Sequence, residues 1–353
     1  MRVVTLLLAV AAVGTYGQSC MGRCGVDDGS SGCQCNSLCS SFGDCCHDYD
    51  ELCMSCKDRC GEPFSSVKPC QCNHACYSHN DCCQDYADQC EDRVTDADLR
   101  ALTEMMFAAD VNSVGSQLTL DYQGKGNSGD LAPGPLFTSV PDSALNGPTL
   151  SLLRKVQDNY EPSVTIAEKQ DAAEVAEQNA FLDAITNTQV MHIAEDFLKN
   201  NSLLTGNLKD KLNKIWFTMY PRSGNIVGSS GFEHVFVGEL KNGKVSGFHN
   251  WVRFYTEEDK GTLNYMGWSK VVDLGDKGEI NMNHFEWLDK PKSIGSMFVG
   301  TSPELDMATY TVCFLTRPNR SCPVQMNGQQ FKVQTYTLDY NGMVLVGSSY
   351  PDI

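Results

Sequence analysis

The segment from residue 231 to residue 251 reads Gly231-Phe-Glu-His-Val-Phe-Val-Gly-Glu-Leu-Lys-Asn-Gly-Lys-Val-Ser-Gly-Phe-His-Asn-Trp251. Its two histidines, His234 and His249, lie fifteen residues apart, each on a run of strand-like composition. The Asn242-Gly243 pair between them is a strong signal for a hairpin turn. We therefore expect a β-hairpin that brings the two imidazoles together. Near neutral pH, such a pair can serve as a general acid and a general base in one step.

The sequence around this segment changes from helical to strand-like periodicity. Apolar residues recur at helical spacing from Thr95 onward, and a stretch rich in Gly, Ser and Pro follows over 124–148. Helices are expected over 149–160, over 167–199 with a break near Asn187, and over 208–220. After Pro221, strands are expected over 235–237, 244–255, 269–274, 307–315, 331–338 and 343–348. Helices followed by hairpin-linked strands indicate an α+β fold with antiparallel sheets.

The N-terminus has the pattern of a secretory signal peptide. An apolar run from Val3 to Val13 follows Arg2, and small residues precede Gln18. We expect residues 1–17 to be removed and the mature protein to be secreted and extracellular. The apolar run is too short to span a bilayer, and no later stretch is long enough, so no transmembrane segment is expected.

Sixteen of the 18 cysteines lie between residues 20 and 90 and form two sets of eight with nearly equal spacing. The first set is Cys20, Cys24, Cys33, Cys35, Cys39, Cys45, Cys46 and Cys53; the second is Cys56, Cys60, Cys70, Cys72, Cys76, Cys82, Cys83 and Cys90. This density indicates disulfides formed in an oxidising compartment. Spacing alone leaves the pairing within each set open. The remaining two, Cys313 and Cys322, are close enough to close a small loop.

Two further features agree with a secreted protein that does not wrap nucleic acid tightly. Sequons at Asn200 and Asn319 predict N-glycosylation. The formal net charge is −17, and the acidic residues are spread over the cysteine-rich part and the rest of the chain. Such a balance argues against tight, non-specific binding along a phosphate backbone, but it leaves room for a small basic cleft.

The cysteine-rich repeat resembles a known family. The spacing of both sets and the words Asp44-Cys-Cys-His-Asp-Tyr49 and Asp81-Cys-Cys-Gln-Asp-Tyr86 resemble the somatomedin B domain, here over 18–54 and 55–93. The resemblance implies two small disulfide knots and, because relatives are protein-binding modules, an extracellular protein partner. The alternative is that the pair is a spacer or a stability tag without a partner of its own.

The remainder of the chain, residues 94–353, resembles the EndoU (XendoU) family of poly(U)-specific endoribonucleases. The resemblance is carried by Ser229 to Glu239, Gly247-Phe-His-Asn-Trp251, Phe285-Glu-Trp287, Gly300-Thr-Ser-Pro-Glu304 and Gly347-Ser-Ser-Tyr350. It implies a uridylate-specific endoribonuclease of the RNA lyase or hydrolase type. Such an enzyme cleaves single-stranded, U-containing RNA through the ribose 2′-hydroxyl and leaves 2′,3′-cyclic phosphate and 5′-hydroxyl ends.

The resemblance also implies the site residues. The family's catalytic trio falls on His234, His249 and Lys292, with His249 assigned as the base and His234 as the acid. The substrate-binding pair falls on Ser348 and Tyr350. Two acidic positions fall on Glu233 and Glu239, which would orient a histidine or bind a metal ion weakly. In a regular strand these two glutamates would share one face, with His234 on the other.

A metal ion is implied by the resemblance alone. The sequence contains no His-x-His or His-Glu-x-x-His motif and no EF-hand loop, so no metal site is firmly assigned. The expected ion is a weakly bound Mn²⁺, with Ca²⁺ as the alternative.

Three other functions fit the sequence less well. A secreted serine protease lacks the expected Gly-Asp-Ser-Gly-Gly or Gly-x-Ser-x-Gly stretch. A non-catalytic extracellular or matrix protein would act through its somatomedin B pair, and an RNA-binding protein would bind without cutting. The intact set of His234, His249 and Lys292 argues against both of these.

For the oligomeric state, we expect a monomer.

Overall fold

The computed structural model describes residues 19–27, 32–73, 75–90 and 94–353. It separates into two units, residues 1–93 and residues 94–353, each described by itself below. The expected signal peptide, residues 1–17, lies outside the described residues. Among the helices that the structure describes, none combines the length and the apolar character needed to cross a membrane.

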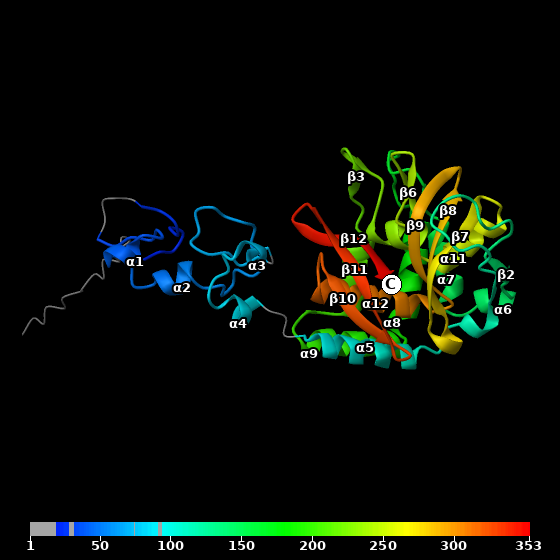
Figure 1. Cartoon of the computed structure of the whole chain (residues 1–353), viewed down its shortest axis with the longest axis horizontal. Helices are drawn as coiled ribbons and strands as arrows, with labels where there is room; N and C mark the ends of the chain where they lie inside the picture. The colour runs from blue at the N-terminus through cyan, green and yellow to red at the C-terminus, as the bar shows by residue number, and fades with distance from the viewer. Residues whose placement is uncertain (1–18, 28–31, 74, 91–93) are drawn as a thin grey trace, which may run out of the picture. The chain divides into compact units, whose positions relative to one another are not determined.

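In its described residues, the cysteine-rich unit contains four short helices, drawn in blue to cyan in Figure 1: α1 (Cys39–Phe42), α2 (Tyr49–Cys53), α3 (Cys76–His79) and α4 (Tyr86–Cys90). Its disulfides are Cys20–Cys35, Cys24–Cys53, Cys33–Cys46 and Cys39–Cys45, then Cys56–Cys72, Cys60–Cys90, Cys70–Cys83 and Cys76–Cys82. Both sets of eight therefore pair in the same order: first with fourth, second with eighth, third with seventh and fifth with sixth. The repeat seen in the sequence is a repeat in connectivity as well.

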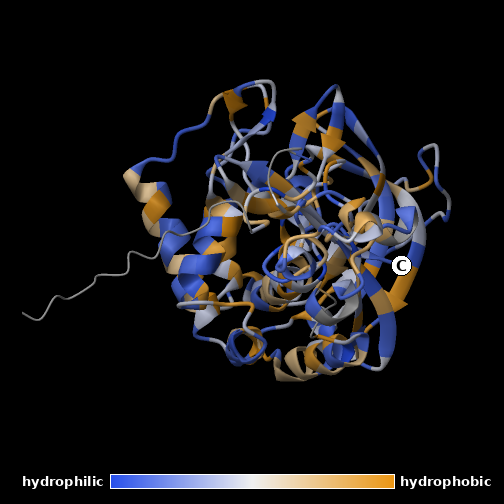
Figure 2. Ribbon diagram, turned by 90° about the vertical axis from the view of Figure 1, so that its left-hand side faces the viewer, coloured by the Kyte–Doolittle hydropathy of each residue, from blue (hydrophilic) through white to orange (hydrophobic). Residues whose placement is uncertain are grey.

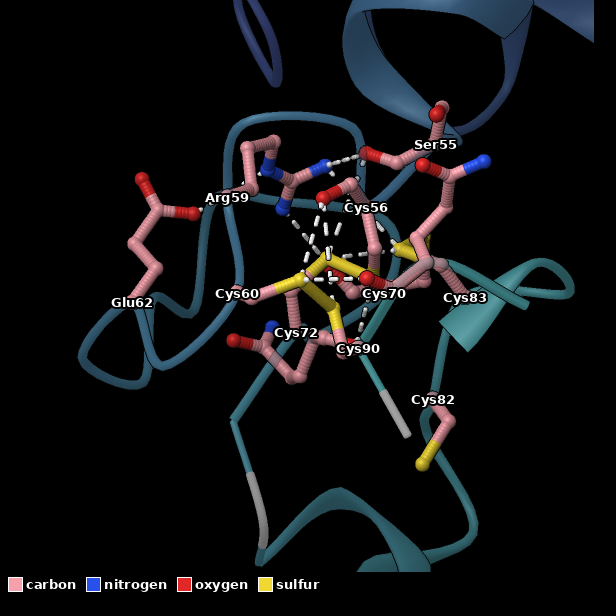
Figure 3. The surroundings of a disulfide bond; sticks show 12 residues. Ser55, Cys56, Arg59, Cys60, Glu62, Cys70, Cys72, Cys82, Cys83 and Cys90 are labelled. Carbon is pink, nitrogen blue, oxygen red and sulfur yellow. Dashed lines mark hydrogen bonds and ion pairs between the residues drawn. A yellow bond between two sulfur atoms is a disulfide. The ribbon is translucent and has the colours of Figure 1, made fainter. Parts of the chain in front are cut away.

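Among the described residues, the buried hydrophobic cluster of each knot consists of cysteines and one tyrosine, Tyr49 or Tyr86, rather than aliphatic side chains. In the second knot, Figure 3 shows the Arg59 side chain reaching across the disulfides. Its guanidinium donates to the carbonyls of Cys53, Ser55 and Cys70 at 3.1, 3.0 and 3.1 Å, and to the Glu62 carboxylate at 3.0 Å. A cation that satisfies several carbonyls at once supports a knot whose own core is small.

The larger unit begins with helices. They are α5 (Asp96–Ala109), α6 (Asp142–Leu145), α7 (Leu150–Gln157), α8 (Ala172–Thr186), α9 (Gln189–Asn200) and α10 (Leu208–Phe217). The start predicted at Thr95 is confirmed by a capping box with Asp98. The predicted break near Asn187 is also confirmed, since Asn187 ends α8 and the Thr188 side chain caps α9.

Antiparallel sheets dominate the second half of this unit, as the α+β prediction requires. Two three-stranded sheets are formed by β7 (Leu263–Asp273), β8 (Glu279–Trp287) and β9 (Lys290–Val299), and by β10 (Ser321–Met326), β11 (Gln329–Tyr340) and β12 (Met343–Asp352). Three two-stranded sheets pair β1 (Thr119–Leu120) with β2 (Phe137–Ser139), β3 (Pro221–Ser223) with β4 (Ile226–Val227), and β5 (Glu239–Lys241) with β6 (Lys244–Ser246). Figure 2 shows that both hydrophilic and hydrophobic residues contribute to the strands. In β11, buried residues alternate with exposed or half-buried ones over 331–336, the pattern of a strand with one buried face.

Two predicted strands are wrong, and a third is too long. Residues 235–237 belong to a π-helical turn, η2 (Glu233–Val237). The strand predicted over 244–255 ends at Ser246, because the Asn250 side chain caps a helix, α11 (Trp251–Asp259). Residues 307–315 lie in the helix α12 (Pro303–Thr316), which is buried on nearly all sides and therefore lacks a polar face that would reveal its period. The strands β8, β9 and β10 and the short strands β1 to β4 were not predicted.

The Cys313–Cys322 disulfide joins α12 to β10, as the loop-closing prediction for these two cysteines anticipated.

Candidate active site

The predicted hairpin is present, and the two histidines flank it. Strands β5 and β6 pair from Glu239–Ser246 to Lys241–Lys244 around the Asn242-Gly243 turn. His234 lies before the hairpin on η2, and His249 lies after it, ahead of α11. Their ring centroids are 6.5 Å apart, and each residue is only 6% exposed. The expected convergence of the imidazoles is confirmed, but neither histidine is on a strand.

Backbone hydrogen bonds hold the two histidine segments side by side. The amide of Phe248 donates to the carbonyl of His234 at 2.8 Å, and the amide of His249 donates to the carbonyl of Val235 at 2.8 Å. On the other side of η2, the rings of Phe232 and Phe236 stack at 5.1 Å within the hydrophobic core. Packing on one side and ladder-like bonds on the other fix the turn that presents His234.

His234 is oriented by a buried acidic residue. Its Nδ1 lies 2.6 Å from a carboxylate oxygen of Glu239. Glu239 also accepts a hydrogen bond from the Ser229 hydroxyl and pairs with Arg222 at 3.0 Å. Burial opposes ionisation of Glu239, but His234, Arg222 and Ser229 together lower the pKa of its carboxyl. An ionised Glu239 fixes His234 with a proton on Nδ1, so that Nε2 is the atom available for chemistry.

Burial and then the Arg222 cation lower the pKa of His234 to about 4, although Glu239 favours the imidazolium. In the free site, His234 is therefore neutral near pH 7. A negative charge brought close to Nε2 would raise this pKa, because an anion stabilises the charged ring.

His249 is held in the complementary manner. Its Nδ1 donates to the carbonyl oxygen of Ser296 at 2.8 Å, since a carbonyl can only accept. The second ring nitrogen, Nε2, thus carries a free lone pair. Burial, followed by the Lys292 charge, lowers the pKa of His249 well below its usual value. The Tyr350 ring stacks on the imidazole at 4.9 Å with planes 22° apart.

Lys292 comes from β9 and reaches the same place. Its ammonium donates to the carbonyl of Gly247 at 2.7 Å, and burial lowers its pKa to about 8. A cavity of about 350 Å³ joins these groups; it is lined by His234, Gly247, His249, Met282, Lys292, Ile294, Gly295, Ser296, Ser348, Tyr350 and Asp352. The three expected catalytic side chains and both expected substrate-binding side chains therefore meet at one cavity.

The two glutamates differ from the expected pair. Because η2 is helical and Gly238 turns the chain, they are not alternate residues on one strand face. Glu239 supports His234, whereas Glu233 is 0% exposed and neither of its carboxyl oxygens has a hydrogen-bond partner among the described residues. Burial, and then Glu239 and Glu168, raise the pKa of Glu233 to about 10. Glu233 is thus a buried acid that keeps its proton near neutral pH, and it is not among the residues that line the cavity.

Arg222 was missed by the sequence reasoning. It lies on β3 and donates to the Ser229 hydroxyl at 3.0 Å, to the Tyr220 hydroxyl, and to the carbonyl of Gly347 at 2.8 Å. Together with its ion pair to Glu239, these bonds connect the support of His234 to β12, which carries Ser348 and Tyr350. A single arginine after a proline has no sequence signal that reveals such long-range contacts.

The donor set does not form a ready metal site. Among the described residues, the only groups of three His, Cys, Asp or Glu ligand atoms within 4.8 Å of one another are the cysteine sets 20/35/46 and 56/72/83. All six of these cysteines are in disulfides. At the cavity, the oxygens of Glu239 are engaged by His234, Ser229 and Arg222. A divalent ion would find no preformed carboxylate cage there.

Comparison with known proteins decides the family. The family described as endoribonuclease XendoU matches residues 98–351, and the somatomedin B domain matches residues 18–55 and 54–93. The chain belongs to the XendoU endoribonuclease family. Activity in this family is metal-dependent in general.

Two similar proteins match the chain almost from end to end, and a solved structure matches most of it. A uridylate-specific endoribonuclease of Paralichthys olivaceus is 37% identical over 99% of both chains. One of Homo sapiens is 32% identical over 94% of this chain and 77% of its own length. The solved structure of XendoU, titled a splicing independent snoRNA processing endoribonuclease, has a TM-score of 0.62 and 32% identity, covering 72% of this chain and 95% of that chain.

Proposed function

We propose that this XendoU-family protein is a secreted uridylate-specific endoribonuclease. It cleaves single-stranded RNA by attack of the ribose 2′-hydroxyl on the adjacent phosphorus. The observation that carries the proposal is the meeting of His234, His249 and Lys292 at one cavity beside Tyr350. An acid, a base and a cation around one phosphate are what this transesterification needs.

His249 acts as the general base. Its Nδ1–H is committed to Ser296, and its low pKa keeps Nε2 unprotonated at neutral pH. Nε2 removes the proton from the 2′-hydroxyl while the 2′-oxygen forms its bond to phosphorus. No external nucleophile takes part.

His234 acts as the general acid. The bond from phosphorus to the 5′-oxygen breaks, and that oxygen takes a proton from His234 Nε2. The substrate phosphate supplies the negative charge that raises the pKa of His234 on binding, and Glu239 pairs with the resulting imidazolium. The products are a 2′,3′-cyclic phosphate and a 5′-hydroxyl.

Lys292 stabilises the charge that develops on the non-bridging oxygens. Its ammonium is already held by Gly247, so little reorganisation accompanies the reaction. Ser348 and Tyr350 form the uracil site: the hydroxyl of Ser348 bonds the edge of the base, and the Tyr350 ring supplies a stacking surface. Any Mn²⁺, or Ca²⁺ in its place, is held weakly, since the cavity offers no cage of its own.

The test is cleavage of a short oligodeoxynucleotide that contains one ribouridine, with and without Mn²⁺ or Ca²⁺. Wild-type protein should cut only after this residue and leave a cyclic phosphate, and deoxyuridine at that position should abolish cleavage. Intact oligonucleotide under all conditions would overturn the proposal and favour a non-catalytic role for the somatomedin B pair. A product with a linear 3′-phosphate and no cyclic precursor would overturn the mechanism.

We also propose that the protein is secreted and acts outside the cell. The boundaries 1–17, 18–54, 55–93 and 94–353 define the signal peptide, the two somatomedin B domains and the nuclease domain. Asn200 and Asn319 are exposed in the structure and can accept glycans. The somatomedin B pair binds an extracellular protein, and the nuclease is a monomer. Mass spectrometry of the secreted protein, with and without a glycosidase, tests the cleavage point and both sequons.

A further inference from the structure

The uracil site is continuous with the open face of a sheet. In the β11–β12 register, Tyr336 pairs with Ser348, Gln334 with Tyr350, and Lys332 with Asp352. Paired residues of an antiparallel sheet point to the same side. Ser348, Tyr350 and Asp352 line the cavity, so their three partners on β11 lie on the cavity side of the sheet.

The opposite side of the same strand is core. Val333 and Thr335, which alternate with these partners, are 0% exposed. The three cavity-side residues are only partly buried or exposed. The sheet therefore presents a half-open polar face that begins at the cavity and extends across β11.

On β11, the large aromatic residue of this face is Tyr336. It is 45% exposed, and its ring centroid lies 6.4 Å from that of Tyr350 with planes 31° apart. Tyr350 in turn stacks on His249. Three rings thus lead in sequence from the proposed base, through the uracil site, to the surface of the sheet.

We propose that Tyr336 forms a second nucleobase subsite, which stacks the base of the nucleotide next to the scissile uridylate. The subsite rests on the proposed function, because its ligand is the same single-stranded RNA. Aromatic side chains on open sheet faces stack unpaired bases in this manner, and every base has a π-face to offer. The subsite therefore adds affinity for a neighbouring base of any identity.

The charges on this face indicate that stacking, rather than phosphate binding, provides the affinity. Lys332 pairs in register with Asp352, which places an opposite charge beside it. A contact based on phosphates weakens steeply with salt, whereas base stacking does not. The contribution of Tyr336 should therefore persist at high ionic strength.

The experiment compares substrates that differ by one base. Full-length protein is given oligonucleotides with a single ribouridine, in which the neighbouring nucleotide on either side carries its base or is abasic. For the wild type, loss of the base on one side should lower kcat/KM about tenfold at both low and high salt, the size expected of one stacked base. Tyr336→Ala should lower kcat/KM on the complete substrate to the same extent. The kcat/KM of this variant should then be the same for the complete and the abasic substrate.

Two variants separate stacking from other roles of Tyr336. Tyr336→Phe keeps the ring and should behave like the wild type. Tyr340→Ala, near the hairpin end of the same strand, is the matched control and should retain the tenfold base effect. If Tyr336→Ala slows complete and abasic substrates equally, Tyr336 only supports Tyr350 and the subsite is wrong. If the wild type is indifferent to both neighbouring bases, the subsite is also wrong. Failure of the wild type to cut any substrate would instead overturn the proposed function.

Discussion

At the scale of single residues, the fixed tautomer of His249 has a direct consequence for catalysis. Because Nδ1–H is bound to Ser296, Nε2 of His249 keeps its lone pair free to accept the proton of the 2′-hydroxyl in the cavity. We expect His249→Ala to lower kcat by about 10²–10⁴-fold, the usual contribution of a general base. His192→Ala, on the exposed side of α9, is the control and should leave kcat unchanged. Thermal unfolding of both variants checks that the fold survives; a fully active, folded His249→Ala would remove His249 from the mechanism.

The alkaline limit of activity should be set by Lys292. Burial lowers its pKa to about 8, so the ammonium is charged below that pH and loses its proton as the pH rises through it. Since the cation stabilises the transition state, kcat/KM should fall as the pH rises through this range. In an active Lys292→Arg variant, the decrease of kcat/KM should move to higher pH, because a guanidinium stays charged. A pH profile of kcat/KM that is identical in both proteins would contradict this role.

At the scale of elements, the end of β6 determines how closely the two histidine segments approach. Gly247 has a φ of 66°, and a Cβ there would lie 1.8 Å from the carbonyl oxygen of His234. Gly243 in the hairpin turn has a similar φ of 73° but open space around it, so it makes a matched control. We expect Gly243→Ala to cost only backbone strain, about 1 kcal/mol, or a decrease of ~2–4 °C in Tm.

Gly247→Ala should cost more, because it must separate His234 from β6 as well. A displacement of this kind can lower kcat by about 10²-fold. Calorimetry and single-turnover cleavage of the two variants measure the difference. Equal Tm and equal activity in the two alanine variants would show that the close approach is not needed.

The same elements show what the sequence could predict. The starts of α5 and α9 follow local caps at Thr95 and Thr188, and the β5–β6 hairpin follows its Asn-Gly turn, so each was predictable from neighbouring residues. The helix α12 was mistaken for a strand because burial on all sides removes the polar face. The turn η2 is stabilised by Phe232 and Phe236 against the core and by the segment after β6, contacts that no local pattern encodes.

At the candidate site, the sequence motifs shared with the family identified five side chains of the cavity. The residues that bind and orient these side chains were visible only in the structure. Arg222 contacts Glu239 and the carbonyl of Gly347, which lies 125 residues away along the chain. The neutral, buried state of Glu233 likewise depends on surroundings supplied by other segments. Residue identity predicted the chemistry, while the tautomers and the charge states required the tertiary fold.

At the scale of the whole molecule, the acidic charge is spread along the chain, whereas the proposed RNA site is confined to one unit. The net charge of −17 disfavours binding along an RNA backbone and leaves recognition to one small cavity and its rim. Every residue of that cavity belongs to residues 94–353. The cysteine-rich unit has its own disulfides and its own small cores, and it shares none of the cavity residues.

Removal of residues 1–93 should therefore leave catalysis intact. A domain with its own core folds alone, so the fragment 94–353 should cleave the ribouridine oligonucleotide with a kcat/KM within about twofold of the full chain. The Cys313–Cys322 disulfide lies in the fragment, so it must be produced under oxidising conditions. Circular dichroism and thermal unfolding establish that the fragment is folded before its rate is compared. A folded fragment that is much slower than the full chain would show that the somatomedin B pair contributes to RNA cleavage itself, and its function could no longer be confined to binding a separate protein.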